Sequence, residues 1–209
     1  PSNVVWPSNI GCYAVNVLLG SPSVADNCSI ASISNNAPFV FPLGTTTVTW
    51  TVVDGSGNTA TATQTVTIVD IVAPALMAPV AINTITNSSC TATGVILGNP
   101  IANDNCSSVT VTNNAPVAFP LGNTTVTWTV VDASGNTTTA TQLVTVRDVE
   151  LPTITAPAAV NVTTNTACTA TGVTLGTPVT ADNCSVASVT NNAPAAFPLG
   201  TTTVTWTIV

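Results

Sequence analysis

The sequence predicts an all-β protein made of tandem β-sandwich modules. Three observations support this prediction. The 209-residue chain matches itself without a gap when it is shifted by 78 residues, which is typical of an array of one small module. Its longest regular segments alternate β-branched or aromatic residues with polar ones, and turns rich in Gly, Pro and Asn separate them. No segment shows the apolar spacing of a helix.

The period predicts three modules, at residues 1–78, 79–156 and 157–209, each of which opens on a proline. The third is expected to lack its last strands, because the recurrence of Asp54 two periods later falls at position 210. We expect the continuing chain or a neighbouring copy to supply those strands. Tandem arrays of this kind serve mechanical or adhesive roles more readily than catalytic ones.

The early strands of a module are marked by pairs of inward-facing residues. Val17 and Leu19 define one strand, and Ala31 and Ile33 define another. Apolar residues recur at the matching positions of the second and third modules. Each pair therefore predicts a short strand in every module.

The most regular part of the module is a predicted hairpin. In residues 45–53, Trp50 and its flanking valines share one face and threonines share the other, which is the pattern of a half-buried strand. A Gly-rich turn at 54–58 leads to a second alternating run at 61–69. The same parity places the recurring tryptophans in the core: Trp50, Trp128 and Trp206.

Two glutamines, Gln64 and Gln142, fall on the inward parity of the second hairpin strand. A buried amide needs hydrogen-bond partners. Either the strand lies at the edge of the sandwich, or this face looks onto the neighbouring module, and the sequence leaves both interpretations open. About seven short strands per module, with one tryptophan and two cysteines, are typical of an immunoglobulin-like β-sandwich.

Each module carries two cysteines that are 16 residues apart, and pairing within modules is the economical prediction: Cys12–Cys28, Cys90–Cys106 and Cys168–Cys184. A bond of this loop length stabilises a module by about 3 kcal/mol. The alternative is a series of links between modules, such as Cys28 to Cys90. An even cysteine count without a CxxC motif or histidine favours disulfides over zinc, and an extracellular setting.

Charged residues are scarce: one basic residue, Arg147, stands against eight acidic ones, for a net charge of −7. Such a chain cannot neutralise phosphates, which excludes nucleic acid as a partner. No apolar run has the length of a membrane span. A weakly charged Thr/Asn/Ala surface repels little, so lateral packing into a fibre is favoured. Alternatively, that surface is simply hydrated or carries glycans, for which seven Asn-x-Ser/Thr sequons are present.

Seven of the eight acids recur at three positions of the repeat: Asp26, Asp104 and Asp182; Asp54 and Asp132; Asp70 and Asp148. One interpretation is calcium at the module junctions, because carboxylate oxygens are its preferred ligands. The other is turn capping by Asp side chains. For the first two sets the turn interpretation is favoured, since one carboxylate per loop is few for calcium. For Asp70 and Asp148 the two interpretations stand equal.

Catalysis is not expected. The chain has no histidine and no lysine to act as a base, so nucleophilic triads are excluded. A pair of carboxylates would have to come from acids that recur in every module, which suits structure better than a unique active site. No cofactor is required, and calcium is the one candidate.

These motifs together resemble the hyalin repeat (HYR) module. The resemblance rests on Cys-Thr-Ala-Thr, Asp-Asn-Cys-Ser, the block from Phe-Pro-Leu-Gly to Asp-Gly-Ser-Gly-Asn, and a closing Val-Thr-Ile-Val-Asp before the next proline, and it covers all three modules. It implies an immunoglobulin-like fold and a role in adhesion or scaffolding in extracellular proteins, including those of bacterial surfaces. Some members of the family carry a further cysteine near the position of Gln64, which this chain lacks.

The expected function is that of a non-enzymatic, extracellular structural and adhesive protein that forms a rod, stalk or filament at a bacterial surface. Its expected partners are further copies of the module in the same chain, and other copies of the protein in a homo-oligomer or fibre. The alternative is a spacer or carbohydrate-binding region of a larger secreted enzyme.

Overall fold

A computed structural model describes residues 1–209 and contains twenty β-strands and no α-helix. It therefore has no helical segment with the length and apolarity that crossing a membrane requires. The all-β prediction and the tandem β-sandwich prediction are confirmed. The chain forms two compact units, which comprise residues 1–80, 98–115 and 126–142 in the first, and 81–97, 116–125 and 143–209 in the second.

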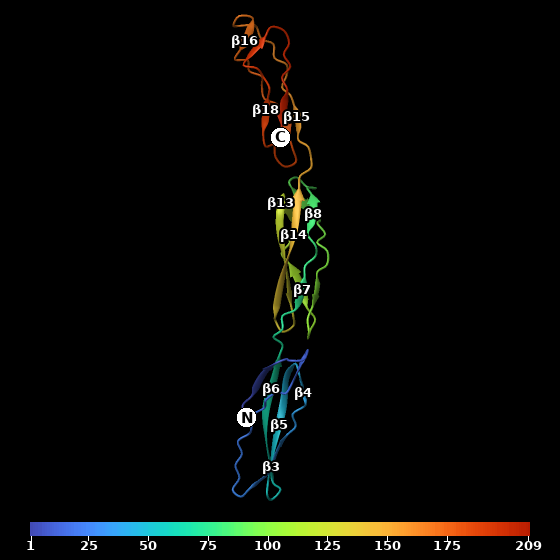
Figure 1. Ribbon diagram of the computed structural model, residues 1–209, viewed down its shortest axis with the longest axis vertical. Coiled ribbons are helices and arrows are strands. Elements are labelled where there is room, and N and C mark those ends of the chain that lie inside the picture. Colours follow the sequence, from blue (N-terminus) through green and yellow to red (C-terminus); the bar gives the residue numbers. More distant parts are fainter. The chain divides into compact units, whose positions relative to one another are not determined.

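The first repeat lies wholly in the first unit and contains six strands: β1 (Val4–Pro7), β2 (Tyr13–Val15), β3 (Ile30–Asn35), β4 (Val40–Pro42), β5 (Gly44–Asp54) and β6 (Thr59–Val69). Four of them form a sheet in the order β1-β6-β5-β3, and β2 pairs with β4 in a second sheet. The predicted hairpin is β5 with β6, which pair antiparallel along their whole length. Strand β1 adds to β6 in parallel (Figure 1).

The core of the first repeat lies between these two sheets. Alternation along β5 and β6 turns every second side chain inward, and β2 and β4 each add one buried residue. The buried apolar cluster comprises Ala14, Phe41, Val48, Trp50, Val66 and Ile68. Trp6 and Val17 pack against it from the side.

Gln64 is fully buried in this core, and hydrogen bonds satisfy its amide. Its Oε1 accepts from the indole Nε1 of Trp50 at 3.0 Å. Its Nε2 donates to the backbone carbonyls of Ser2, at 2.6 Å, and Leu19, at 2.9 Å. The glutamine thus bonds within its own repeat, because β6 lies between β1 and β5 and not at the edge of the sheet.

The first unit also holds strands of the second repeat: β7 (Ala75–Met77), β10 (Ile101–Asn103), β11 (Thr110–Asn113), most of β13 (Gly122–Val131) and the first half of β14 (Thr137–Arg147). Strand β7 pairs antiparallel with β10, so a strand that precedes Pro79 belongs structurally with the second repeat. Strand β11 pairs antiparallel with β13. Trp128 of β13 is buried and donates to Gln142 Oε1 at 3.1 Å, as Trp50 does to Gln64.

The second unit contains the remaining strands: β8 (Ile82–Ile85), β9 (Thr91–Thr93), β12 (Ala118–Pro120), β15 (Thr153–Thr155), β16 (Thr169–Thr171), β17 (Val179–Ala181), β18 (Val189–Asn191), β19 (Ala196–Pro198) and β20 (Trp206–Ile208). The end of β14 pairs in parallel with β8, as β6 does with β1. The second repeat therefore has the strand order β11-β13-β14-β8, which corresponds to β3-β5-β6-β1 in the first.

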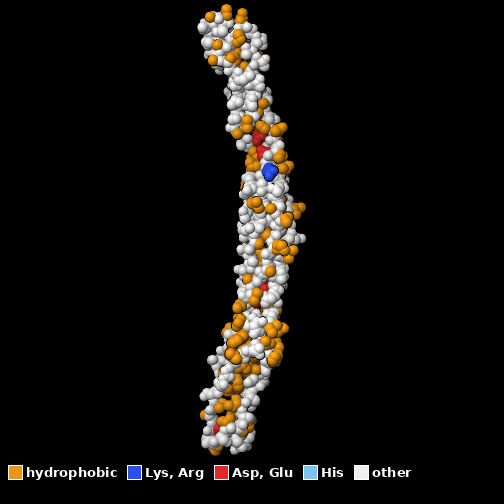
Figure 2. Space-filling view, viewed as in Figure 1, with side chains coloured by type: hydrophobic (Ala, Val, Ile, Leu, Met, Phe, Trp, Pro, Cys, Tyr) orange, Lys and Arg blue, Asp and Glu red, His pale blue; other side chains and the backbone are white.

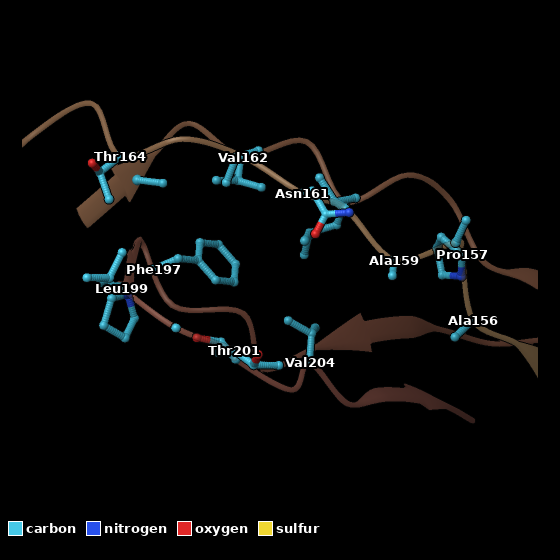
Figure 3. A pocket seen from close by; sticks show the side chains of 18 of the residues that line it. Ala156, Pro157, Ala159, Asn161, Val162, Thr164, Phe197, Leu199, Thr201 and Val204 are labelled. Atoms are coloured by element: carbon cyan, nitrogen blue, oxygen red, sulfur yellow. The ribbon is translucent and has the colours of Figure 1, made fainter. Parts of the chain in front are cut away.

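The third repeat has an open core. A cavity of about 380 Å³ is lined by residues that include Ala170, Phe197, Val204 and Trp206. These positions match Ala14, Phe41, Val48 and Trp50, which are buried in the first repeat. Figure 3 shows the side chains of Phe197 and Val204 directed into this space. Trp206 is accordingly only partly buried, whereas Trp50 and Trp128 are buried.

The surface is weakly charged. On the face drawn in Figure 2, hydrophobic side chains are scattered among uncharged ones, and charged side chains are few. Several large apolar residues are strongly exposed, among them Phe39, Ile96 and Leu151. This composition agrees with the chain's 4% content of charged residues.

Candidate functional site

Three aspartates from two consecutive repeats meet in the first unit. Asp70 follows β6, Asp104 follows β10 and Asp132 follows β13. Each offers one carboxylate oxygen, and these three atoms lie within 4.8 Å of one another. The sequence identified all three positions, but it did not show that Asp70 of one repeat meets the two loop aspartates of the next.

Backbone amides hold the loop carboxylates in place. Asp132 Oδ1 accepts from the backbone N–H groups of Ser134, at 2.9 Å, and Asn136, at 2.8 Å. Asp104 Oδ2 accepts from the N–H groups of Cys106, at 2.8 Å, and Ser107, at 2.9 Å. These hydrogen bonds, led by that from Cys106, lower the pKa of Asp104, so this carboxyl is ionised at neutral pH.

Asn136 connects the two repeats at this site. Its side-chain Nδ2 donates to Asp132 Oδ2 at 2.8 Å and to the backbone carbonyl of Asp70 at 3.2 Å. Asp70 Oδ1 accepts from the N–H of Val72 at 3.1 Å, which turns the chain after β6. In each of the three aspartates, at least one carboxylate oxygen accepts a hydrogen bond from a backbone N–H of the loop that follows it, and these bonds fix the position of the carboxylate.

Two of the carboxylate oxygens at this site have no donor. Asp70 Oδ2 and Asp104 Oδ1 are buried and unpartnered, and Asp70 and Asp132 are each only 6% exposed. Residues 1–146 contain no lysine, arginine or histidine, so no side-chain cation of this stretch can offset the three negative charges. Like charges at this separation destabilise one another. A bound cation would relieve both the repulsion and the missing hydrogen bonds.

The donor set fits calcium. All three side-chain ligands are carboxylates, which are hard oxygen donors, and calcium takes six to eight such oxygens with carbonyls and waters completing the shell. Calcium binding at this site needs no thiolate or imidazole ligand. The acidic cluster between the first two repeats is therefore compatible with calcium.

A second acidic cluster lies in the second unit. Asp148 and Asp182 approach each other there, together with Cys184. They are the equivalents of Asp70 and Asp104, one period later. Asn183 Nδ2 donates to Asp148 Oδ1 at 3.1 Å, while its own Oδ1 is buried without a partner. This cluster is only half-buried and has two carboxylates.

The remaining two aspartates cap turns in the first repeat. Asp26 Oδ1 accepts from the N–H groups of Cys28 and Ser29, at 2.8 and 3.0 Å. Asp54 accepts from the backbone of Ser56 and from the backbone and side chain of Asn58. The side chain of Asn58 is the main cause of a lowered pKa for Asp54. Such bonds are those of Asx-type turns.

The cysteine pairing differs from the predicted one. Cys90 is bonded to Cys184, whose Cα lies 4.6 Å away, and not to Cys106. The predicted pairs Cys90–Cys106 and Cys168–Cys184 are therefore wrong, and Cys12, Cys28, Cys106 and Cys168 have no disulfide partner in this structure. The bond joins the first cysteine of the second repeat to the second cysteine of the third.

The physical reason is visible in the first repeat. Leu43 N–H donates to the Cys12 carbonyl at 3.0 Å, next to the start of β5. Cys28 lies just before β3, whose first residue, Ile30, is opposite Asp54 at the other end of β5 (Figure 1). An 11-residue strand spans about 35 Å, whereas the two Cα atoms of a disulfide lie within about 7 Å. Cys12 and Cys28 therefore cannot bond to each other.

Cys12 lies instead beside Cys106 of the next repeat. Its Sγ donates to the Asn105 carbonyl at 3.2 Å, and Cys106 Sγ donates to the Gly11 carbonyl at 3.1 Å. Partial burial, together with the hydrogen bond to Cys12, raises the pKa of Cys106 to about 12. The repeat period is consistent with Cys106 as the partner of Cys12. The same spacing is equally consistent with pairing inside each repeat, so the sequence does not distinguish the two.

Comparison with known proteins agrees with the repeat. The HYR domain family matches residues 1–68 and 69–146. The chain is 33% identical over 214 residues to hyalin of Strongylocentrotus purpuratus, covering 95% of this chain and 18% of that protein. It is 32% identical over 219 residues to hyalin of Lytechinus variegatus, covering 99% of this chain and 41% of that protein. The chain thus spans less than half of the length of either relative.

Solved structures with some likeness include the extracellular cadherin domains 1–4 of protocadherin gamma B7, at 13% identity, covering 91% of this chain and 60% of that one, with a TM-score of 0.38. Human protocadherin-24 EC1-2 is 12% identical, covering 69% of this chain and 93% of that one, with a TM-score of 0.36. The family match covers 146 of the 209 residues and agrees with the 78-residue period. This chain is a tandem array that belongs to the HYR domain family.

Proposed function

We propose that this chain is part of an extracellular, non-enzymatic structural and adhesive protein that forms a rod, stalk or filament at a bacterial surface. In this proposal the repeats at 1–78, 79–156 and 157–209 are its building blocks, and calcium stiffens their junctions. The observation that carries it is the convergence of Asp70 with Asp104 and Asp132, since residues of two consecutive repeats contribute to one acidic site.

The structural role is supported by what the repeats share. Hyalin repeats recur along the chain. In each copy the recurring side chains lie in the core, in turns or at the junction with the next copy. Trp50 and Trp128 are buried and hydrogen-bonded to glutamines, so they cannot serve as platforms for a carbohydrate ligand. The weakly charged, apolar-rich surface favours contact between neighbouring copies.

The calcium role follows from electrostatics. Three carboxylates of two repeats repel one another when no cation is bound, which favours a loose junction. A divalent cation reverses the sign of this interaction and links the two repeats through ligands from both. By ligand linkage, a cation that binds only the ordered junction stabilises it by an amount that grows with the ratio of its concentration to its Kd.

Electron microscopy of the native surface material, with and without a calcium chelator, tests the proposal. We expect straight, thin fibres in calcium and more flexible ones after chelation. Small-angle scattering of the 209-residue chain provides the molecular control, because its maximum dimension should be longer and better defined in calcium than in chelator. Native material without fibres would refute the filament part of the proposal. A maximum dimension that is the same in calcium and in chelator would refute the calcium part.

A further inference from the structure

The thiols of Cys12 and Cys106 are in contact across the first repeat boundary. Each sulfur donates to the backbone carbonyl that precedes the other cysteine: Cys12 Sγ to Asn105, at 3.2 Å, and Cys106 Sγ to Gly11, at 3.1 Å. Both residues belong to the first unit. The two sulfurs therefore lie where a bond between them requires only small side-chain rotations.

The second repeat boundary shows the same arrangement in its bonded form. Cys90 and Cys184 are the positions one period after Cys12 and Cys106, and they form a disulfide. The surroundings agree as well, since Asn105 Nδ2 donates to the Gly11 carbonyl at 3.4 Å and Asn183 Nδ2 donates to the matching Ser89 carbonyl at 3.5 Å.

The backbone before the first cysteine is also the same at the two boundaries. Gly11 and Ser89 both have positive φ, at 57° and 50°. A non-glycine residue in this conformation is uncommon, so the matching turn is a specific feature of the repeat. The two boundaries thus place their cysteines through the same local structure.

We propose that Cys12 and Cys106 form a disulfide, and that the pairing rule of the array joins the first cysteine of each repeat to the second cysteine of the next. Successive repeats are then linked covalently end to end. The loops closed by Cys12–Cys106 and Cys90–Cys184 overlap over residues 90–106, so a single break of the backbone anywhere between residues 12 and 184 leaves the two pieces joined.

The bond forms by thiol–disulfide exchange with an oxidising disulfide of the extracellular or periplasmic space. The two S–H bonds of Cys12 and Cys106 break and one S–S bond forms, with the loss of two electrons and two protons. The S–S bond of the oxidant breaks and takes up both, giving two thiols. This inference rests on the proposed function only for its oxidising compartment, and it does not depend on calcium.

The sequence provides two unique cleavage points that test the pairing. Met77 is the only methionine and Arg147 the only basic residue, so cyanogen bromide cuts once, after Met77, and trypsin cuts once, after Arg147. The oxidised chain is alkylated and denatured before cleavage and is then run on gels with and without reductant. Because the proposed loops enclose both points, the two fragments should stay joined in either digest until reductant is added. Pairing within repeats encloses neither point and would release the fragments.

Two matched double variants separate this proposal from other links between repeats. In Cys12→Ser/Cys106→Ser, the cyanogen bromide fragments should part without reductant. In Cys28→Ser/Cys168→Ser, which removes the two exposed thiols that the rule leaves without a partner in these 209 residues, the fragments should stay joined. Release of fragments from the oxidised wild-type chain, or from the second variant, would overturn the proposal. Fibre morphology is a separate readout, so the proposed function can fail while the pairing holds, or the reverse.

Discussion

The indole Nε1 of Trp50 donates to Gln64 Oε1 at 3.0 Å inside the first sandwich. This bond joins the two strands of the central hairpin on their buried side, and it satisfies the only polar atom of the tryptophan side chain. Gln64 Nε2 then reaches the carbonyls of Ser2 and Leu19, which lie in the segments that flank the sheet. The same pair recurs as Trp128 and Gln142.

Replacement of Gln64 by leucine should destabilise the first repeat by about 1–3 kcal/mol, because it leaves the buried indole N–H of Trp50 and the carbonyls of Ser2 and Leu19 without this partner. Hydrogen exchange of the β5 and β6 amides measures this change locally. Thr63→Ala, at the neighbouring exposed position, is the matched control and should change the opening free energy by no more than about 0.5 kcal/mol. Equal effects of the two variants would contradict the network.

The variant Asp70→Asn should change stability in opposite directions with and without calcium. In chelator it removes one of three repelling charges, so its melting temperature should exceed that of the wild type. In calcium it removes a ligand. At a free calcium concentration of 100 times Kd, binding raises the free energy of unfolding of the wild type by about 2.7 kcal/mol, and the variant should lose most of this stabilisation. Calorimetry in both buffers measures this crossing. Asp26→Asn, which alters a turn aspartate outside the cluster, should leave the calcium response intact.

Acid should weaken the turn between β5 and β6. The pKa of Asp54 lies below its ordinary value of 3.8, mainly through the side chain of Asn58. A lowered folded-state pKa means that the ionised carboxylate stabilises the fold above pH 3.8, and that this contribution disappears as the pH falls through the folded value. An NMR titration of the Asp54 carboxyl should show the low midpoint. Asn58→Ala should move that midpoint upward, and an unchanged midpoint would contradict the assignment of its cause.

Alkylation of the reduced chain should distinguish Cys106 from the exposed cysteines. The pKa of Cys106 is raised to about 12, so at pH 8 in chelator and reductant only a small fraction is thiolate, the reactive form. Cys28 is exposed and should react with iodoacetamide much faster. Peptide mass spectrometry over time gives both rates. Comparable rates at pH 8 would show that Cys106 is not held as a thiol by its surroundings.

The sequence alone determined the fold class, the hairpin and the repeat. Alternation of buried and exposed positions in β5 and β6 follows from the two-residue period of a strand. The alternation of valines and tryptophan with threonines in the sequence is therefore enough to predict it. The same parity placed Gln64 inward, but its partners Ser2 and Leu19 are 62 and 45 residues away. No local pattern encodes such distant contacts.

Tertiary structure alone decided which recurring residues meet. A perfect repeat is consistent with cysteine pairing at a separation of 16 residues within a repeat or of 94 residues between repeats, and the spacing cannot distinguish them. The length of β5 determines the pairing, because it places Cys12 and Cys28 at opposite ends of one sandwich. The first cysteine of a repeat therefore lies near the second cysteine of the next repeat and far from the second cysteine of its own. For the same reason Asp70, at the end of β6, meets the loop aspartates Asp104 and Asp132 of the following repeat and not their equivalents in its own.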